Sequence, residues 1–274
     1  MDKIEVFDNA LIQHGDYNKR IYVLKFPEQG DRNLVKKLTK KAIDNGYSKV
    51  IAKVPKSRLN IFLTTGYKVE TTIPNFFNGK EDCCFVSKFT DLSRAIYDPK
   101  PLQKFNSVLK NYNFTDDQPS KNGLEIRELT SGDAEEITEI YKSVFETYPF
   151  PVFDVDYIKE TMKSHVIYFG AFEKGKLLSV SSSEMDVENQ NAEMTDFAAR
   201  HEARGKGLSK LLLGVMEEKM KEKNIKTLYT IARLNSIPMN KTFMGAGYNY
   251  AGTLINNTNI SGGIESMNIW YKYI

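Results

Sequence analysis

The stretch that decides the fold reads Arg204-Gly205-Lys206-Gly207-Leu208-Ser209. It follows a run typical of a strand, residues 192–199, and precedes a run typical of a helix, residues 208–223. A strand that passes through glycines into a helix leaves several backbone N–H groups unpaired at the positive end of the helix dipole. Gly205 and Gly207 also allow a phosphate to come close to the backbone, because neither carries a Cβ atom. The stretch predicts an anion site, although a plain strand-to-helix connection would have the same pattern.

The surrounding residues exclude the better-known phosphate loops. A Walker loop needs Gly-Lys-Ser or Gly-Lys-Thr after four spacer residues, and a dinucleotide loop needs a third glycine and a later acidic residue. Instead, a strand-like run at 227–232 is followed by Asn235, by a short helix-like run at 236–244 and by Gly247-Tyr248. This order resembles the GNAT family of acyl-CoA-dependent N-acetyltransferases, and the resemblance extends over residues 124–274.

The GNAT resemblance implies a fold and a set of cofactor contacts. The fold is α/β with a mixed α+β sheet, in the element order β-α-α-β-β-β-α-β-α-β-β. The glycine turn is implied to hold the pyrophosphate of the cosubstrate acetyl-CoA, with the pantetheine arm between two splayed strands. The implied cofactor-binding residues are Ala198, Ala199, Arg204, Gly205, Lys206, Gly207, Leu208, Ser209, Asn235 and Phe243. One departure is Glu202, because the family usually has Gln or Arg three residues before the first glycine.

Composition and charge narrow the class of protein. The chain has 274 residues with 38 basic and 35 acidic side chains, and its net charge of +3 is too balanced to predict binding to nucleic acid. No apolar run is long enough to span a bilayer, and the first residues lack the apolar core of a signal peptide. Adjacent Cys83 and Cys84 suit a reduced cytoplasmic protein, and three isolated histidines support no metal site. With the resemblance, this predicts a cytoplasmic enzyme for a small-molecule amine, without a membrane partner and with its oligomeric state open.

The front of the chain repeats the pattern of its end. Gly66-Tyr67 corresponds to Gly247-Tyr248 at an offset of 181 residues (247 − 66), and Phe62 corresponds to Phe243 at the same offset. Further on, residues 79–89 parallel residues 263–273 at an offset of 184 (263 − 79). The front segment therefore resembles the C-terminal half of the same fold, unless two ordinary αβ patterns coincide.

The repeat predicts two modules. Residues 1–115 would form a degenerate half-GNAT module, and residues 123–274 the catalytic GNAT domain. The polar and aperiodic stretch 111–122 is typical of a linker. The front turn at 27–32 carries two carboxylates and one glycine where the anion site should be, so we expect this module to bind no cofactor.

The chemistry needs a base, since an ammonium with a pKa of about 10.4 must lose a proton before it attacks a thioester. Glu193 and Asp196 are the candidate catalytic residues, on the strand before the glycine turn. Alternation along that strand predicts that they point to opposite faces, and the resemblance favours Glu193. Glu184 and Asp186 on the neighbouring strand are rivals, and any of these carboxylates would serve equally well to pair with a lysine or to bind substrate.

The acid for the departing thiolate is missing from its usual position. Many GNAT proteins have a tyrosine four residues before the Gly-aromatic pair, but Phe243 stands there and cannot donate a proton. A thiolate leaves without much assistance, so activity does not depend on this position. Tyr229, Tyr248 or a water would substitute.

The acceptor-binding loop is expected between the first two helices of the catalytic domain. Its proline-stiffened sequence carries Tyr148, Phe150 and Phe153, whose rings suit a slot for an alkyl chain, although each ring would also pack in a core. Asp154 either binds an amine or caps the following helix. With Glu184, these four residues make up the predicted substrate-binding set.

Three phrases resemble one GNAT family closely, the β-lysine ε-acetyltransferases. They begin at Ile12-Gln13-His14-Gly15, Glu146-Thr147-Tyr148-Pro149 and Leu254-Ile255-Asn256-Asn257, so the match includes the front module. The resemblance implies acetyl transfer to the ε-amine of β-lysine, which yields a zwitterionic compatible solute (an osmolyte). Two alternatives remain: a GNAT enzyme for another amine, such as a polyamine or a protein terminus, and a non-catalytic CoA-binding regulatory protein.

Overall fold

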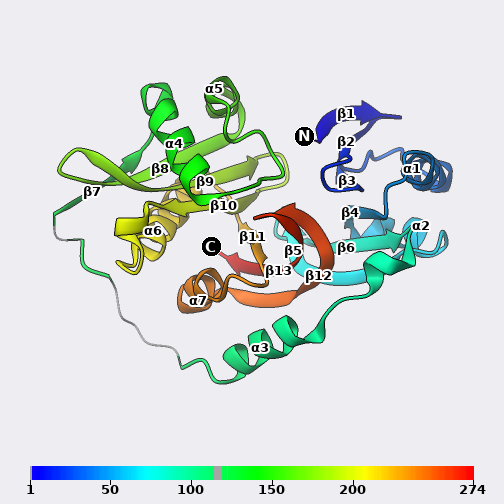
Figure 1. Cartoon of the computed structure of the whole chain (residues 1–274). Helices are drawn as coiled ribbons and strands as arrows, with labels where there is room; N and C mark the ends of the chain where they lie inside the picture. Colours follow the sequence, from blue (N-terminus) through cyan, green and yellow to red (C-terminus); the bar gives the residue numbers. More distant parts are fainter. Residues whose placement is uncertain (1, 114–118, 122) are drawn as a thin grey trace.

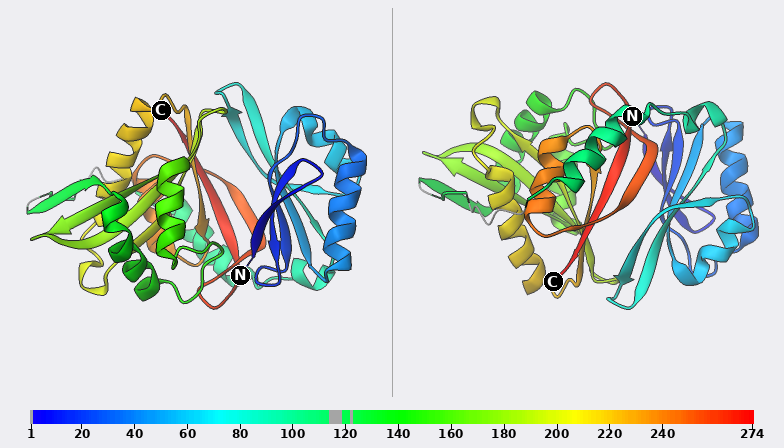
Figure 2. Two further views of the ribbon diagram at one scale, coloured as in Figure 1. Left: turned by 90° about the horizontal axis from the view of Figure 1, so that it is seen from above. Right: turned by 90° about the horizontal axis from the view of Figure 1, so that it is seen from below.

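Two mixed β-sheets, one from each half of the chain, form the protein (Figure 1 and Figure 2). The computed structural model describes residues 2–113, 119–121 and 123–274. The first sheet has the strand order β1-β2-β3-β4-β6-β5. Its strands and helices are β1 (Lys3–Phe7), β2 (Ala10–Gly15), β3 (Arg20–Lys25), α1 (Arg32–Asp44), β4 (Lys49–Pro55), α2 (Leu59–Leu63), β5 (Lys68–Phe77) and β6 (Glu81–Phe89).

The second sheet has the strand order β7-β8-β9-β10-β11-β13-β12. Its elements are β7 (Leu124–Glu128), α4 (Ala134–Val144), α5 (Val155–Ser164), β8 (Val166–Glu173), β9 (Lys176–Asp186), β10 (Asn191–Ala199), α6 (Leu208–Glu222), β11 (Thr227–Arg233), α7 (Ile237–Gly245), β12 (Asn249–Ile260) and β13 (Gly263–Tyr273). The element order is the one predicted from the sequence, and the GNAT fold is confirmed for this half.

Helix α6 shows how the sequence sets the position of the glycine turn. Its apolar residues recur every three or four positions, so one stripe is buried against the sheet: Leu208, Leu211, Leu212, Met216 and Met220. The stripe shares a buried cluster with Leu178 of β9 and with Ala192 and Met194 of β10. The helix is therefore fixed against β9 and β10, with its N-terminus at the end of β10.

The repeat of the first module in the second is confirmed by topology. Strands β1-β2-β3-β4-β6-β5 have the same order and relative directions as β8-β9-β10-β11-β13-β12, so the repeat also includes β1, β2 and β3, three strands more than the sequence indicated. The irregularities of pairing repeat as well. β5 has register shifts at Val69/Thr71 and Ile73/Phe77, and β12 has them at Tyr250/Gly252 and Leu254/Thr258, each at the offset of 181 (250 − 69, 258 − 77).

The helix of the first module that corresponds to α6 has a different N-terminus. Helix α1 is capped by Asp31, whose carboxylate accepts a hydrogen bond from the Leu34 N–H at 2.9 Å. A carboxylate thus occupies the position at which an anion would bind a helix N-terminus. This local arrangement agrees with the expectation that the first module binds no cofactor.

The two modules meet through a buried polar interface. Lys49 of β4 is fully buried, forms an ion pair with Glu70 at 2.8 Å and donates to the backbone oxygen of Ile255 in β12 at 2.7 Å. Arg20 donates to the backbone oxygen of Asn257 at 2.6 Å. At Gly252 a Cβ atom would lie 2.7 Å from the Thr71 hydroxyl, so β12 and β5 can approach this closely only with glycine there.

Helix α3 (Pro99–Lys110) precedes the predicted linker and packs on the second sheet (Figure 1). Its Phe105 ring lies 5.1 Å from the Tyr250 ring and 6.0 Å from Trp270. Residues 114–118 and 122 of the linker lie outside the described residues, so the division into 1–115 and 123–274 stays a prediction. None of the described helices combines the length and the apolar character needed to cross a membrane.

Candidate active site

Strands β10 and β11 separate in the middle of the second sheet. They run parallel and pair only where Asn191 to Glu193 meet Thr227 to Tyr229. Beyond this point β10 has a bulge, seen as a shift in its register with β9 between Thr195 and Ala198. The pairing therefore ends beside Glu193, on the strand that leads to the glycine turn.

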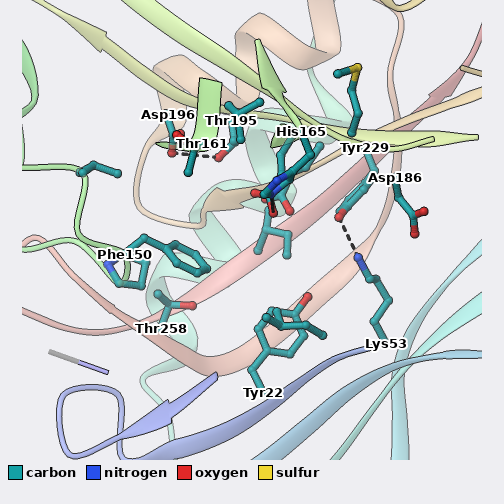
Figure 3. Close-up of a pocket in the computed structure, with 18 of the residues that line it drawn as sticks. Tyr22, Lys53, Phe150, Thr161, His165, Asp186, Thr195, Asp196, Tyr229 and Thr258 are labelled. Atoms are coloured by element: carbon teal, nitrogen blue, oxygen red, sulfur yellow. Dashed lines mark hydrogen bonds and ion pairs between the residues drawn. The ribbon is translucent and has the colours of Figure 1, made fainter. Parts of the chain in front are cut away.

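A pocket of about 490 Å³ opens beside this point, between the two sheets (Figure 3). Its lining includes residues of both modules, among them Tyr22, Lys53, Glu193 and Tyr229. The first module therefore forms one wall of the site. Sequence reasoning missed these wall residues, and the only signal was the family resemblance of the front phrase Ile12-Gln13-His14-Gly15.

Glu193 lies in this pocket and is shielded from bulk solvent by its walls. Burial raises the pKa of its carboxyl to about 8, and the neighbouring negative charge of Glu184 adds to the shift. The Lys53 ammonium and a hydrogen bond with Tyr229 act in the opposite direction. A carboxylate with a raised pKa in a cleft is a typical proton acceptor.

The expectation that Asp196 points away from Glu193 is wrong. Asp196 has a positive φ of 56° within the β10 bulge, and its side chain lines the same pocket (Figure 3). A bulge adds a residue to one strand and so reverses the alternation beyond it. Simple alternation would place Phe197 on the face of Glu193, but its ring packs edge-on against Phe243 with ring centroids 5.7 Å apart.

Asp196 is tied to two hydroxyl groups. Tyr148 donates a hydrogen bond to one of its oxygens, and Ser182 donates to the other at 2.6 Å. Burial raises the pKa of the Asp196 carboxyl, while these hydrogen bonds oppose the rise. Asp196 thus holds Tyr148 in place, and Glu193 is the less constrained of the two candidate bases.

The two rival carboxylates also line the pocket. Glu184 lies directly opposite Glu193 across the β9–β10 pair, with 47% of its side chain exposed and with His165 at 3.6 Å. Asp186 lies at the end of β9 and accepts hydrogen bonds from Asn189. Glu184 is the exposed one of the two, whereas Asp186 is half-buried, as Glu193 and Asp196 are.

Of the three aromatic residues predicted in the acceptor loop, two line the pocket, together with Pro149 and Val152 of the same loop. Tyr148 and Phe150 line it, whereas Phe153 packs against the adjoining core. Of the two roles open for Asp154, the structure shows the cap, since its side chain accepts from the Asp156 N–H at 2.9 Å at the start of α5. Gln13 of the first module donates to the backbone oxygen of Pro149 at 2.8 Å and so fixes this loop.

The glycine turn has the form that an anion site requires. Gly205 and Gly207 have φ angles of 80° and 74°, and residues 204–207 are exposed at the start of α6. Lys206 lies 3.7 Å from Glu173. Within the described chain, a Cβ at Gly205 would meet no atom within 4 Å, whereas a Cβ at Gly207 would lie 2.7 Å from the Cβ of Pro119, so the open side of the turn is at Gly205. The residues fit a CoA pyrophosphate, with Arg204, Leu208 and Ser209 on either side of the glycines.

The other predicted cofactor residues lie at the end of β10, in the turn before α7 and in α7 itself. Ala198 and Ala199 end β10, and Ser179 donates to the Ala198 backbone oxygen at 2.8 Å. Asn235 is exposed in the turn before α7. Phe243 is only 1% exposed and lies in the core between Phe197 and Tyr248, so it offers no open surface to a cofactor.

Two tyrosines were candidates for the acid. Tyr229 lines the pocket, and burial raises its pKa well above the usual value, so it stays protonated. Tyr248 is buried in the core beneath α7 and is not among the lining residues. Among the residues that the structure describes, no group of three or more His, Cys, Asp or Glu side chains is placed to hold a metal ion.

Comparison with known proteins gives a consistent result. Residues 134–247 match the model of the acetyltransferase (GNAT) family. The chain is 38% identical to a β-lysine N(6)-acetyltransferase of Methanococcus maripaludis over 99% of both chains, and 32% identical to one of Methanosarcina mazei over 82% of this chain and 91% of that one. Among solved structures, the ribosomal-protein-S18-alanine N-acetyltransferase of Escherichia coli matches 55% of this chain and 94% of its own, with a TM-score of 0.49 at 16% identity.

Proposed function

The chain belongs to the GNAT acetyltransferases, in the family of the β-lysine N(6)-acetyltransferases, and from this premise we propose that it transfers acetyl from acetyl-CoA to the ε-amine of β-lysine. We further propose that the product serves as a compatible solute and that the enzyme acts in the cytoplasm. The buried, unpaired thiols of Cys83 and Cys84 suit that compartment.

The observation that carries the proposal is the position of Glu193. It lies where β10 and β11 part, shielded inside the pocket, on the strand that leads to the glycine turn. An amine in the pocket and a thioester between the parted strands would meet beside this carboxylate. Binding both reactants at one point converts a bimolecular reaction into an effectively intramolecular one.

In the proposed mechanism Glu193 accepts a proton from the ε-ammonium, directly or through a water. The free amine attacks the carbonyl carbon of the thioester, so that a C–N bond forms and the C–S bond breaks. The thiolate leaves with the electron pair and takes up a proton, for which Tyr229 is the candidate donor in the pocket. The nitrogen loses its second proton as the amide forms, and this proton restores Tyr229. The glycine turn at 204–209 binds the pyrophosphate through backbone N–H groups and so fixes the other end of acetyl-CoA.

The charges of the pocket match the acceptor. β-Lysine carries two ammonium groups and one carboxylate at neutral pH. The pocket lining contains the carboxylates Glu184, Asp186, Glu193 and Asp196 together with the lysine Lys53. Tyr148 and Phe150 supply apolar surface for the alkyl chain between the charged groups.

Steady-state thiol release with a set of acceptors tests the proposal. We expect β-lysine to have a higher kcat/KM than α-lysine, spermidine or a peptide amine. α-Lysine carries its second amine one carbon closer to the carboxylate and should react poorly. A higher kcat/KM for spermidine or the peptide would show that the acceptor is another amine, while the assignment as an acetyltransferase would stand. Binding of acetyl-CoA without thiol release from any acceptor would favour a regulatory protein.

A further inference from the structure

We propose that Lys53, on the first module, binds the carboxylate of the acceptor and thereby makes the enzyme select an amino acid over a polyamine. The inference rests on the proposed function, since it takes the acceptor to be an amine that carries a carboxylate. It gives the first module a role in the reaction although that module carries no glycine turn of its own.

Lys53 is held at the pocket by aromatic residues of both modules. Its ammonium donates a hydrogen bond to the Tyr229 hydroxyl at 3.0 Å (Figure 3). The same nitrogen lies 5.1 Å from the centroid of the Tyr229 ring and 5.6 Å from that of Phe76. These contacts fix where the charge lies but satisfy only one of the three ammonium donors.

Lys53 is the lysine of this pocket that lacks a carboxylate partner among the described residues. Lys25 pairs with Glu188 at 2.8 Å, and His165 lies 3.6 Å from Glu184. Arg20 is committed to the backbone oxygen of Asn257 and to the Thr258 hydroxyl. No ion pair within 4.0 Å involves Lys53 in the part of the chain that the structure covers. A half-buried ammonium without a counterion is costly, and the carboxylate of an acceptor would supply one.

The two signs of charge come from opposite walls. The acidic residues Glu184, Asp186, Glu193 and Asp196 lie on β9 and β10 of the second module, and Lys53 lies on β4 of the first. An acceptor with an ammonium at one end and a carboxylate at the other fits across this gap. A polyamine would leave Lys53 unpaired and would bring a second positive charge toward it, so the arrangement also acts against the wrong substrate.

The test compares β-lysine with 1,4-diaminopentane, which keeps both amines and the carbon chain but lacks the carboxylate. kcat/KM for each is measured for the wild type and for Lys53→Met, on the pH plateau of each protein. We expect the wild type to prefer β-lysine. Lys53→Met should lose about 10- to 100-fold of that preference, the effect of one charge-assisted hydrogen bond, with little change for the diamine.

Two further variants make the result specific. Lys25→Met removes a lysine that lines the same pocket but is paired with Glu188, and it should leave the preference unchanged. Lys53→Gln keeps a donor for the Tyr229 hydroxyl and removes only the charge, so it should behave as Lys53→Met does. Activity of either Lys53 variant with the diamine shows that the protein is folded.

A Lys53→Met or Lys53→Gln protein that keeps the wild-type preference overturns the inference. An equal loss with both acceptors also overturns it, and assigns Lys53 to the support of Tyr229 and Glu193 instead. A wild type that prefers the diamine, or that acetylates neither compound, refutes the proposed function and the inference with it.

Discussion

Replacing Glu193 by glutamine should remove the general base and leave the shape of the pocket unchanged. The loss of a positioned base lowers kcat by roughly 10²–10⁴. Glutamine accepts no proton at neutral pH, so the variant depends on the small fraction of acceptor that is already a free amine.

The raised pKa of Glu193 fixes how this loss changes with pH. With a pKa of about 8, only about a tenth of the carboxyl is ionised at pH 7, so the wild-type rate should rise about tenfold toward pH 9 and then level off. The free amine rises about tenfold per pH unit until its own pKa of about 10.4, and the variant should follow it. Between pH 7 and pH 9 the deficit of Glu193→Gln should therefore shrink about tenfold.

The assay is thiol release at saturating acetyl-CoA, with kcat and kcat/KM for β-lysine measured across this pH range. Glu184→Gln is the matched control, because Glu184 lies opposite Glu193 in the register of β9 and β10 but its side chain is about half exposed. The negative charge of Glu184 helps to raise the pKa of Glu193. The Glu184→Gln control should therefore stay active, and its Glu193 should ionise at a lower pH than in the wild type. A nearly normal and pH-insensitive kcat for Glu193→Gln would refute the assignment and move it to Asp196 or Glu184.

Three other predictions follow from the structure. Gly205→Ala should raise the KM for acetyl-CoA with little change in kcat at saturation, because L-residues rarely adopt a φ of 80° and the added Cβ would lie in the turn proposed to bind the phosphate. An unchanged KM in a folded variant would place the phosphate elsewhere. Glu70→Ala should lower the free energy of unfolding by about 3–5 kcal/mol, measured by urea denaturation, because it leaves the Lys49 ammonium buried and unpaired; a loss below about 1 kcal/mol would contradict this. Calorimetry should find one acetyl-CoA site per chain, since Asp31 already caps α1, and a second site would overturn the degenerate first module.

Local patterns in the sequence predicted most of the fold. The glycine turn and the strand-like and helix-like runs around it, together with the family resemblance, predicted the order of elements in the second module. The offsets of 181 and 184 predicted the repeat, and they reappear in the pairing of β5 with β6 and of β12 with β13 (250 − 69; 271 − 87). These features depend on residues close together in the chain, which periodicity and turn residues can indicate.

The candidate site was predicted less completely, for two physical reasons. The β10 bulge breaks the two-residue alternation, and nothing local to the sequence marks Asp196 as the residue that takes a positive φ. The wall formed by the first module depends on contacts such as Lys53 to Tyr229, which are 176 residues apart in the chain. Neither hydrophobic periodicity nor a local motif in a single sequence indicates such a long-range contact.

The most direct test of the central claim is the position of the acetyl group in the product. The purified protein is incubated with acetyl-CoA and β-lysine, and the product is examined by two-dimensional NMR, in which the new amide proton correlates with the carbon that bears the acetylated nitrogen. The proposed function predicts a single product acetylated on the ε-amine, formed with one equivalent of free thiol. Acetylation of the β-amine, or thiol release without acetylated β-lysine, would contradict it.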